Sequence, residues 1–189
     1  LKGITEEAVE KFEKMHDEDE TEKIVAFCQM LEPLQHSIDA GEGFQMRYSR
    51  QRSRMKKEGE PSILRPNRIV AIALTHGHLD HTWGLLPFLQ TLSLDGRQQP
   101  LTVYGPTSTA ILDILETDGI DARLPEGTAS AELLNQYRAW FGLGGTSSNL
   151  GYEVRWLLGD PKSNRWVEFC EDASNLVWHD AMPQPEAFT

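Results

Sequence analysis

The sequence is poor in cysteine and has no long apolar run. Cys28 and Cys170 are the only two cysteines among 189 residues, too few for a disulfide framework or a four-cysteine zinc site. The longest apolar stretches, Ile69–Leu74 and Trp83–Leu89, are far shorter than the roughly 20 residues that span a bilayer. We therefore expect reduced, buried thiols, a cytoplasmic location and no association with a membrane.

Positive charge is scarce overall but concentrated in one place. The net charge of −11 argues against a general nucleic-acid coat. Residues 1–23 hold nine acids and four bases, whereas residues 47–57 hold six bases and no acid. This basic segment is either a solvated helix face or a site for RNA phosphates, which basic side chains bind without regard to sequence. The candidate RNA-binding residues are Arg47, Arg50, Arg52 and Arg54.

Apolar periodicity predicts alternating strands and helices, which indicates a layered α/β domain. The chain is long enough for one domain with a real core. Predicted helices cover residues 5–15, 24–31, 44–57, 84–92, 108–116, 131–141 and, briefly, 166–170. Predicted strands cover 36–39, 69–74, 101–104, 152–158 and 176–178, and the glycine-rich stretch 142–148 is expected to be flexible.

The segment Thr75–His81 holds four potential metal ligands directly after a predicted strand. Side chains alternate along an extended chain, so His76 and His78 point the same way and can share one cation. Asp80 and His81 follow where the chain turns into a helix, and they can reach a second cation. Imidazole and carboxylate suit Zn²⁺, with Mn²⁺ or Fe²⁺ as alternatives, and the lack of a thiolate favours a catalytic site. The competing interpretation is a chance histidine cluster on a surface loop.

His76-Gly77-His78-Leu79-Asp80-His81 resembles the H-x-H-x-D-H motif of the metallo-β-lactamase superfamily. The resemblance implies an αββα sandwich over residues 36–189, which this chain need not contain in full. Residues 1–35 have no counterpart in that family, and we expect them to form an N-terminal helical segment. The motif is specific for the fold but not for the substrate, because the superfamily acts on lactams, thioesters, lactones and nucleic acids.

Further segments, in order along the chain, are similar to the tRNase Z (ribonuclease Z) branch of that superfamily. Ile38–Gln45 resembles the segment D-C-G-E-G-T-Q, and Gly84–Gln90 resembles the helix G-L-P-G-L-L. Leu101–Pro106 is similar to the next strand and turn. Gly159-Asp160 and Leu176–Ala181 resemble the segments G-D-T and L-L-I-H-E-A-T.

The tRNase Z resemblance implies a role for each matching residue. The ligands of two divalent metal ions, zinc being the first choice, would be His76, His78, Asp80, His81 and Asp160, with Asp160 bridging the pair. His179 would donate a proton near the scissile phosphate, and Asp80 would also belong to the catalytic group. The alternatives are a simple turn residue for Asp160 and a packed core histidine for His179.

The sequence departs from the tRNase Z pattern at several places. Residues 145–150, just before Gly151-Tyr152, contain no histidine, although the family has a ligand there, and the ligand expected after the H-E-A-T segment is not found. Pro161 replaces the threonine after the aspartate. Three explanations stay open: an incomplete chain, ligands from a partner subunit, or an impaired site.

We therefore predict a metal-dependent phosphodiesterase, an RNA endonuclease that processes the 3′ ends of precursor tRNA. By resemblance we also expect a homodimer. One alternative is a hydrolase of the same fold that acts on a small ester, lactone or cyclic phosphodiester. The other is a non-catalytic paralogue that binds RNA.

Overall fold

The computed structural model describes residues 36–59, 69–123, 129–170 and 175–185. Its strands are β1 (His36–Ile38), β2 (Ala71–Ala73), β3 (Leu101–Pro106), β4 (Val154–Asp160), β5 (Arg165–Phe169) and β6 (Leu176–His179). Its helices are α3 (Phe44–Lys57), α4 (Leu79–Thr82), α5 (Leu85–Leu94), α6 (Thr109–Asp118), α7 (Ala129–Gly142) and α8 (Ser147–Leu150). The predictions for residues 1–35 lie outside the described residues.

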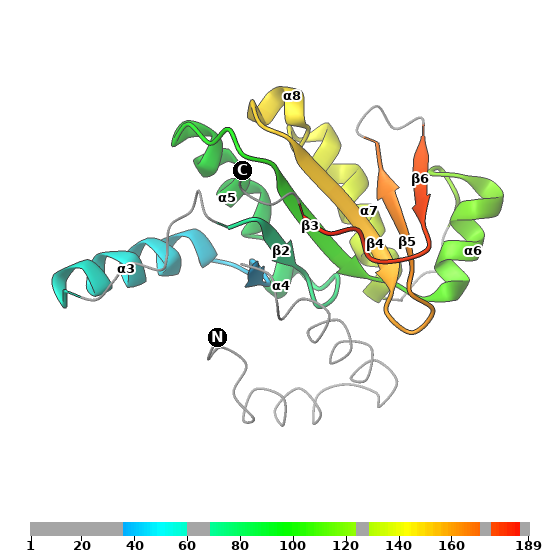
Figure 1. Cartoon of the computed structure of the whole chain (residues 1–189), viewed down its shortest axis with the longest axis horizontal. Coiled ribbons are helices and arrows are strands. Elements are labelled where there is room, and N and C mark those ends of the chain that lie inside the picture. The colour runs from blue at the N-terminus through cyan, green and yellow to red at the C-terminus, as the bar shows by residue number, and fades with distance from the viewer. Residues whose placement is uncertain (1–35, 60–68, 124–128, 171–174, 186–189) are drawn as a thin grey trace.

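The strands form one six-stranded sheet in the order β1-β2-β3-β4-β5-β6 (Figure 1). Strands β1 to β4 are parallel, and β5 and β6 are each antiparallel to the preceding strand. The carboxyl ends of β1 to β4 therefore share one edge of the sheet, and β6 also ends there. Open α/β sheets bind their ligands at this edge. The predicted α/β class is confirmed, although the second sheet of a sandwich is not seen within the described ranges.

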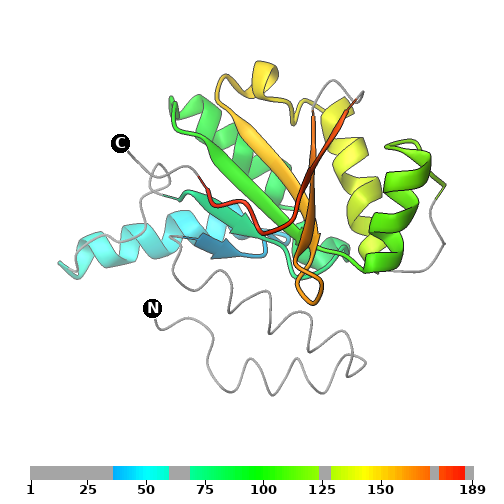
Figure 2. The same ribbon diagram turned by 45° about the vertical axis from the view of Figure 1, so that its right-hand side comes forward.

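Helices α5, α6 and α7 cover one face of the sheet (Figure 2). Each contributes fully buried side chains, such as Leu89, Leu112 and Tyr137, which pack with Trp156 of β4. Each large apolar side chain buried in this way contributes about 1.5–3 kcal/mol. In the part of the chain that is described, no helix has both the length and the apolar composition to cross a bilayer.

The C-terminal segment crosses the opposite face of the sheet (Figure 1). Met182 packs there with buried sheet residues that include Leu157 and Trp166. The Tyr104 hydroxyl donates a hydrogen bond to the Pro183 carbonyl, with 2.6 Å between the oxygens. Burial raises the pKa of Tyr104, so this hydroxyl keeps its proton. The segment is thus anchored to the sheet by both apolar packing and a buried hydrogen bond.

One prediction of local structure is wrong. Residues 166–170 were expected to form a short helix, but Arg165–Phe169 is strand β5. Asn164 adopts a left-handed backbone with φ 55°, which closes a hairpin that pairs Asp160 with Arg165. The stretch 142–148 contains the end of α7 and the start of α8, and between them the Gly145 amide donates a hydrogen bond to the Trp140 carbonyl of α7; the expected flexibility of this stretch stays a prediction.

Candidate metal centre

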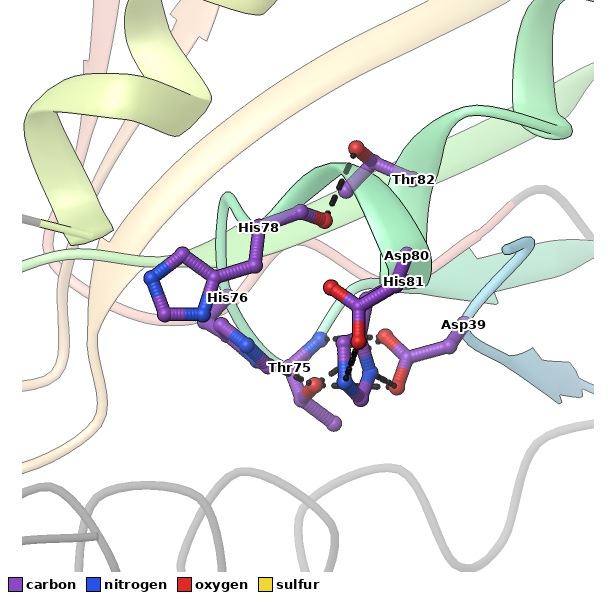
Figure 3. A network of polar contacts seen from close by, with 7 residues as sticks. All are labelled: Asp39, Thr75, His76, His78, Asp80, His81 and Thr82. Atoms are coloured by element: carbon purple, nitrogen blue, oxygen red, sulfur yellow. Dashed lines mark hydrogen bonds and ion pairs between the residues drawn. The ribbon is translucent and has the colours of Figure 1, made fainter. Parts of the chain in front are cut away.

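The histidine loop, defined as Thr75–His81, follows β2 at the edge of the sheet where the parallel strands have their carboxyl ends. His78 ends the extended part of the loop as the N-cap of α4, with φ −68° and ψ 142°. The ring centroids of His76 and His78 lie 4.5 Å apart, and those of His76 and His81 lie 4.1 Å apart (Figure 3). His76 is buried, whereas His78 and Asp80 are exposed. The structure therefore gathers three imidazoles in one bend, from the buried His76 through the half-buried His81 to the exposed His78.

Asp39, the residue after β1, holds this bend in place. Its carboxylate accepts hydrogen bonds from the Thr75 amide at 2.8 Å and the Thr75 hydroxyl at 2.9 Å. The same carboxylate lies 2.8 Å from Nδ1 of His81. This hydrogen bond raises the pKa of His81; burial opposes the shift, and the charges of Asp39 and Asp80 add to it. The bond also fixes the ring so that the other nitrogen, Nε2, faces Asp80 (Figure 3).

The pair formed by His81 and Asp80 fits a metal ion. Nε2 of His81 and Oδ2 of Asp80 lie 3.4 Å apart. Two ligands about 2.1 Å from one Zn²⁺ at a tetrahedral angle are separated by about 3.4 Å. Within the described ranges, however, no group of three or more His, Cys, Asp or Glu side chains is placed to hold one metal ion. The fit is therefore partial: one pair has suitable spacing, and a complete ligand set is not assembled.

Sequence reasoning assigned no role to two residues that contact the loop. Asp39 lies in the segment that resembles D-C-G-E-G-T-Q, so a signal existed, although it did not show which side chains Asp39 would meet. Gln136 of α7 donates a hydrogen bond to the Gly77 carbonyl, between the first two histidines. The two residues are 59 positions apart in the chain, and no motif links them.

Asp160 lies at the end of β4, two strands from β2. Its carboxylate accepts hydrogen bonds from the Thr109 hydroxyl, the Ser163 hydroxyl at 3.0 Å and the Lys162 amide at 2.9 Å. Burial raises the pKa of Asp160, but these hydrogen bonds outweigh it, so the pKa lies below the ordinary value. Two strand spacings correspond to roughly 10 Å along the sheet. These contacts fit a turn residue, and the bridging role of Asp160 stays a prediction.

His179 ends β6, four strands from β2 along the same edge. Its Nε2 lies 3.2 Å from Oε2 of Glu168 on the neighbouring strand. Arg155 of β4 also binds Glu168 through two hydrogen bonds, of 2.9 and 2.7 Å. His179 is thus part of a polar cluster on the sheet, and its role as a proton donor stays a prediction.

The cluster of Glu168, Arg155 and His179 predicts how stability depends on pH. Burial raises the pKa of the Glu168 carboxyl, but the hydrogen bonds and charges of Arg155 and His179 outweigh it, so the pKa lies below 4.5. A lowered folded-state pKa adds stability above the unfolded value, and this stability is lost as pH falls through the folded value. We expect Glu168→Gln to cost about 1–3 kcal/mol at neutral pH and to flatten the acid side of the stability profile.

Chemical denaturation between neutral and acid pH measures this effect. The matched control is Glu153→Gln, which removes an exposed carboxylate beside β4 and should leave both stability and its pH profile nearly unchanged. Equal profiles for wild type and Glu168→Gln would contradict a stabilising role for the cluster.

The four candidate RNA-binding arginines lie on α3, which extends away from the sheet (Figures 1 and 2). All four side chains are exposed: Arg47, Arg50, Arg52 and Arg54. Phe44 and Tyr48 anchor the first turns of the helix by ring contacts with Phe88 of α5, at centroid distances of 4.9 and 5.7 Å. The helix therefore presents its positive charge to solvent from a fixed base.

Residues 37–142 match the family model described as a beta-lactamase superfamily domain. The match covers more than half of the chain, and it includes the whole histidine loop together with Asp39. The chain therefore belongs to this family, as the metal-loop motif predicted.

Several curated relatives carry the name Ribonuclease Z. The chain is 30% identical to the Aeropyrum pernix protein over 158 residues, which is 75% of this chain and 39% of that protein. It is 48% identical over 48 residues to the Latilactobacillus sakei protein, covering 25% of this chain and 15% of that protein. It is 35% identical over 80 residues to the Lactiplantibacillus plantarum protein, covering 42% of this chain and 22% of that protein. The chain thus spans well under half the length of these relatives.

Proposed function

We propose that this chain forms part of a metal-dependent endoribonuclease that processes the 3′ ends of precursor tRNA. The observation that carries the proposal is the bend in which Asp39 orients His81 toward Asp80, at the ligand-binding edge of the sheet. The similarity to proteins named Ribonuclease Z supports RNA as the substrate. A homodimer and a cytoplasmic location, both expected from the sequence, are part of the proposal; sedimentation and cell fractionation test them.

Side chains of the histidine loop would bind two divalent metal ions. His76 and His78 would hold one ion, and Asp80 and His81 the other, with zinc as the first choice and manganese or iron as alternatives. When bound, such ions activate water and neutralise phosphate charge. The Thr75 hydroxyl lies 3.0 Å from Nδ1 of His76, and contacts of this kind orient a ligand ring.

Other residues would bind the RNA and assist the departure of its 3′ oxygen. That oxygen is a poor leaving group unless it gains a proton, and we assign this proton transfer to His179, because imidazole carries a suitable proton near neutral pH. The exposed arginines of α3 would contact the phosphate backbone. Arg47, Arg50 and Arg54 are spaced by three and four residues, so they project from one face of the helix.

The proposal predicts metal-dependent cleavage of a 3′-extended precursor tRNA by the purified protein. A chelator should abolish the cut, and added Zn²⁺ should restore it. His78→Ala should lower both zinc binding and cleavage by more than about 100-fold, because it removes a ligand rather than a group that merely supports one. Leu94→Ala, which truncates an exposed side chain on α5 (88% exposed), is the control and should behave like wild type.

A second candidate function is a non-catalytic domain that binds RNA. It is favoured by the incomplete ligand set within the described residues and by the lack of a histidine in residues 145–150, just before Gly151. Metal analysis of the purified protein separates the two: a protein that binds RNA but takes up no zinc would support the binding domain. Turnover of a lactone or a small phosphodiester, with no cut in tRNA, would instead indicate another hydrolase of this fold.

A further inference from the structure

One tryptophan of this chain is presented to solvent beside the histidine loop. Trp83 is 64% exposed, whereas Trp140, Trp156 and Trp166 are at most 8% exposed. Leu79, one helical turn earlier, is 53% exposed. The Trp83 amide donates a hydrogen bond of 2.8 Å to the Leu79 carbonyl, so the two side chains share one face of α4. Together they form an apolar step, hereafter the Leu79–Trp83 step.

Close backbone packing holds this step in position. A Cβ atom on Gly84 would lie 2.3 Å from the Gly41 carbonyl oxygen and 2.8 Å from that of Ala40. A Cβ atom on Gly41 would lie 1.8 Å from the Asp80 carbonyl oxygen. The backbone of α4 at Asp80, and the chain just after α4 at Gly84, therefore lie directly against the loop after β1, which fixes the position of the backbone that carries the step.

The surroundings of the step indicate what it binds. The exposed side chains of His78 and Asp80 lie in the same short segment, so a ligand on the step would also reach the proposed metal centre. Two side chains expose far less surface than the roughly 800 Å² per partner that a stable protein interface needs. A flat, partly apolar group attached to an anion fits both the small area of the step and its position beside the proposed metal centre. The flat group would stack on the indole ring of Trp83, and the anion would lie at the metal centre.

We propose that the Leu79–Trp83 step is a stacking platform for a nucleobase of the RNA whose phosphate lies at the histidine loop. This inference rests on the proposed function, since it takes RNA as the ligand. Stacking on an aromatic side chain tolerates any base, because every base has a π-face. The platform would therefore position the strand at the loop without selecting its sequence.

The test measures binding of two fluorescein-labelled probes without added metal: a short oligouridylate, and the same ribose–phosphate chain with abasic sites. Trp83→Ala should weaken binding of the oligouridylate by about tenfold and leave binding of the abasic chain unchanged. Trp83→Phe should restore most of the affinity, because it keeps an aromatic face. Arg50→Ala should weaken both probes alike, and Leu94→Ala should weaken neither.

Other results of these binding measurements overturn the platform. If Trp83→Ala lost affinity equally for both probes, Trp83 would be a structural residue. If Trp83→Ala bound the oligouridylate like wild type, Trp83 would not be part of the RNA site. A shift of oligomeric state in Trp83→Ala, with RNA binding intact, would assign the step to a second copy of the chain. The proposed function fails separately: base-dependent binding through Trp83 without any cut in precursor tRNA would retain the platform and exclude the endonuclease.

Discussion

Asp39→Ala is expected to lower zinc affinity by about 10- to 100-fold, as loss of a residue that orients a metal ligand typically does. The carboxylate fixes the ring of His81 and binds both the amide and the hydroxyl of Thr75. Asp39 also has a left-handed backbone with φ 56°, which alanine adopts at a cost of about 1 kcal/mol. With the lost hydrogen bonds, we expect a destabilisation of about 3 kcal/mol or more.

Asp39→Asn separates the metal effect from the folding effect. Asparagine tolerates the left-handed backbone and can still accept a hydrogen bond from the Thr75 amide, so most of the stability should return. It lacks the negative charge that orients and polarises His81, so zinc affinity should stay low. Calorimetric titration with zinc and chemical denaturation give the two values. If both variants bind zinc like wild type, Asp39 does not support a metal ligand.

Gly41→Ala is expected to disrupt the histidine loop by steric overlap alone. The added Cβ would lie 1.8 Å from the carbonyl oxygen of Asp80, 2.9 Å from its carbonyl carbon and 3.5 Å from Cα of His81. All three atoms are backbone, so α4 must move as a unit. We expect a destabilisation of about 3 kcal/mol and a loss of zinc affinity as large as that of Asp39→Ala, because the displaced residues are the proposed ligands.

Two further glycine variants make the steric explanation testable. In Gly84→Ala the added Cβ would lie 2.3 Å from the Gly41 carbonyl oxygen, in the same loop after β1, so this variant should have a similar effect. Gly142→Ala, at the end of α7, meets no atom within 4 Å and should be neutral or slightly stabilising. Thermal unfolding and zinc titration of the three variants decide the matter. Wild-type behaviour of Gly41→Ala would show that α4 shifts freely.

The local elements of the fold were largely predictable. Helix α3 has the predicted bounds, and the predicted strand 69–74 contains β2, because apolar runs and glycine or proline breaks act over a few residues. The prediction failed at β5, where the side chains Trp166, Val167 and Phe169 are all buried. Such a run suits a strand covered on both faces as well as a buried helix. Pairing with β4 and β6 decided between them.

The residues of the histidine loop are neighbours in the chain, so their spacing is fixed by covalent bonds. For this reason the sequence alone could determine the family. It could also group His76 with His78 and His81 and place Asp80 beside them. The order of the strands in the sheet, by contrast, is not fixed by neighbouring residues in the chain. Only the tertiary structure placed Asp39 against His81, 42 positions apart, and Gln136 against Gly77. It also spread Asp160 and His179 along the edge, because strand order sets the distance between residues on different strands.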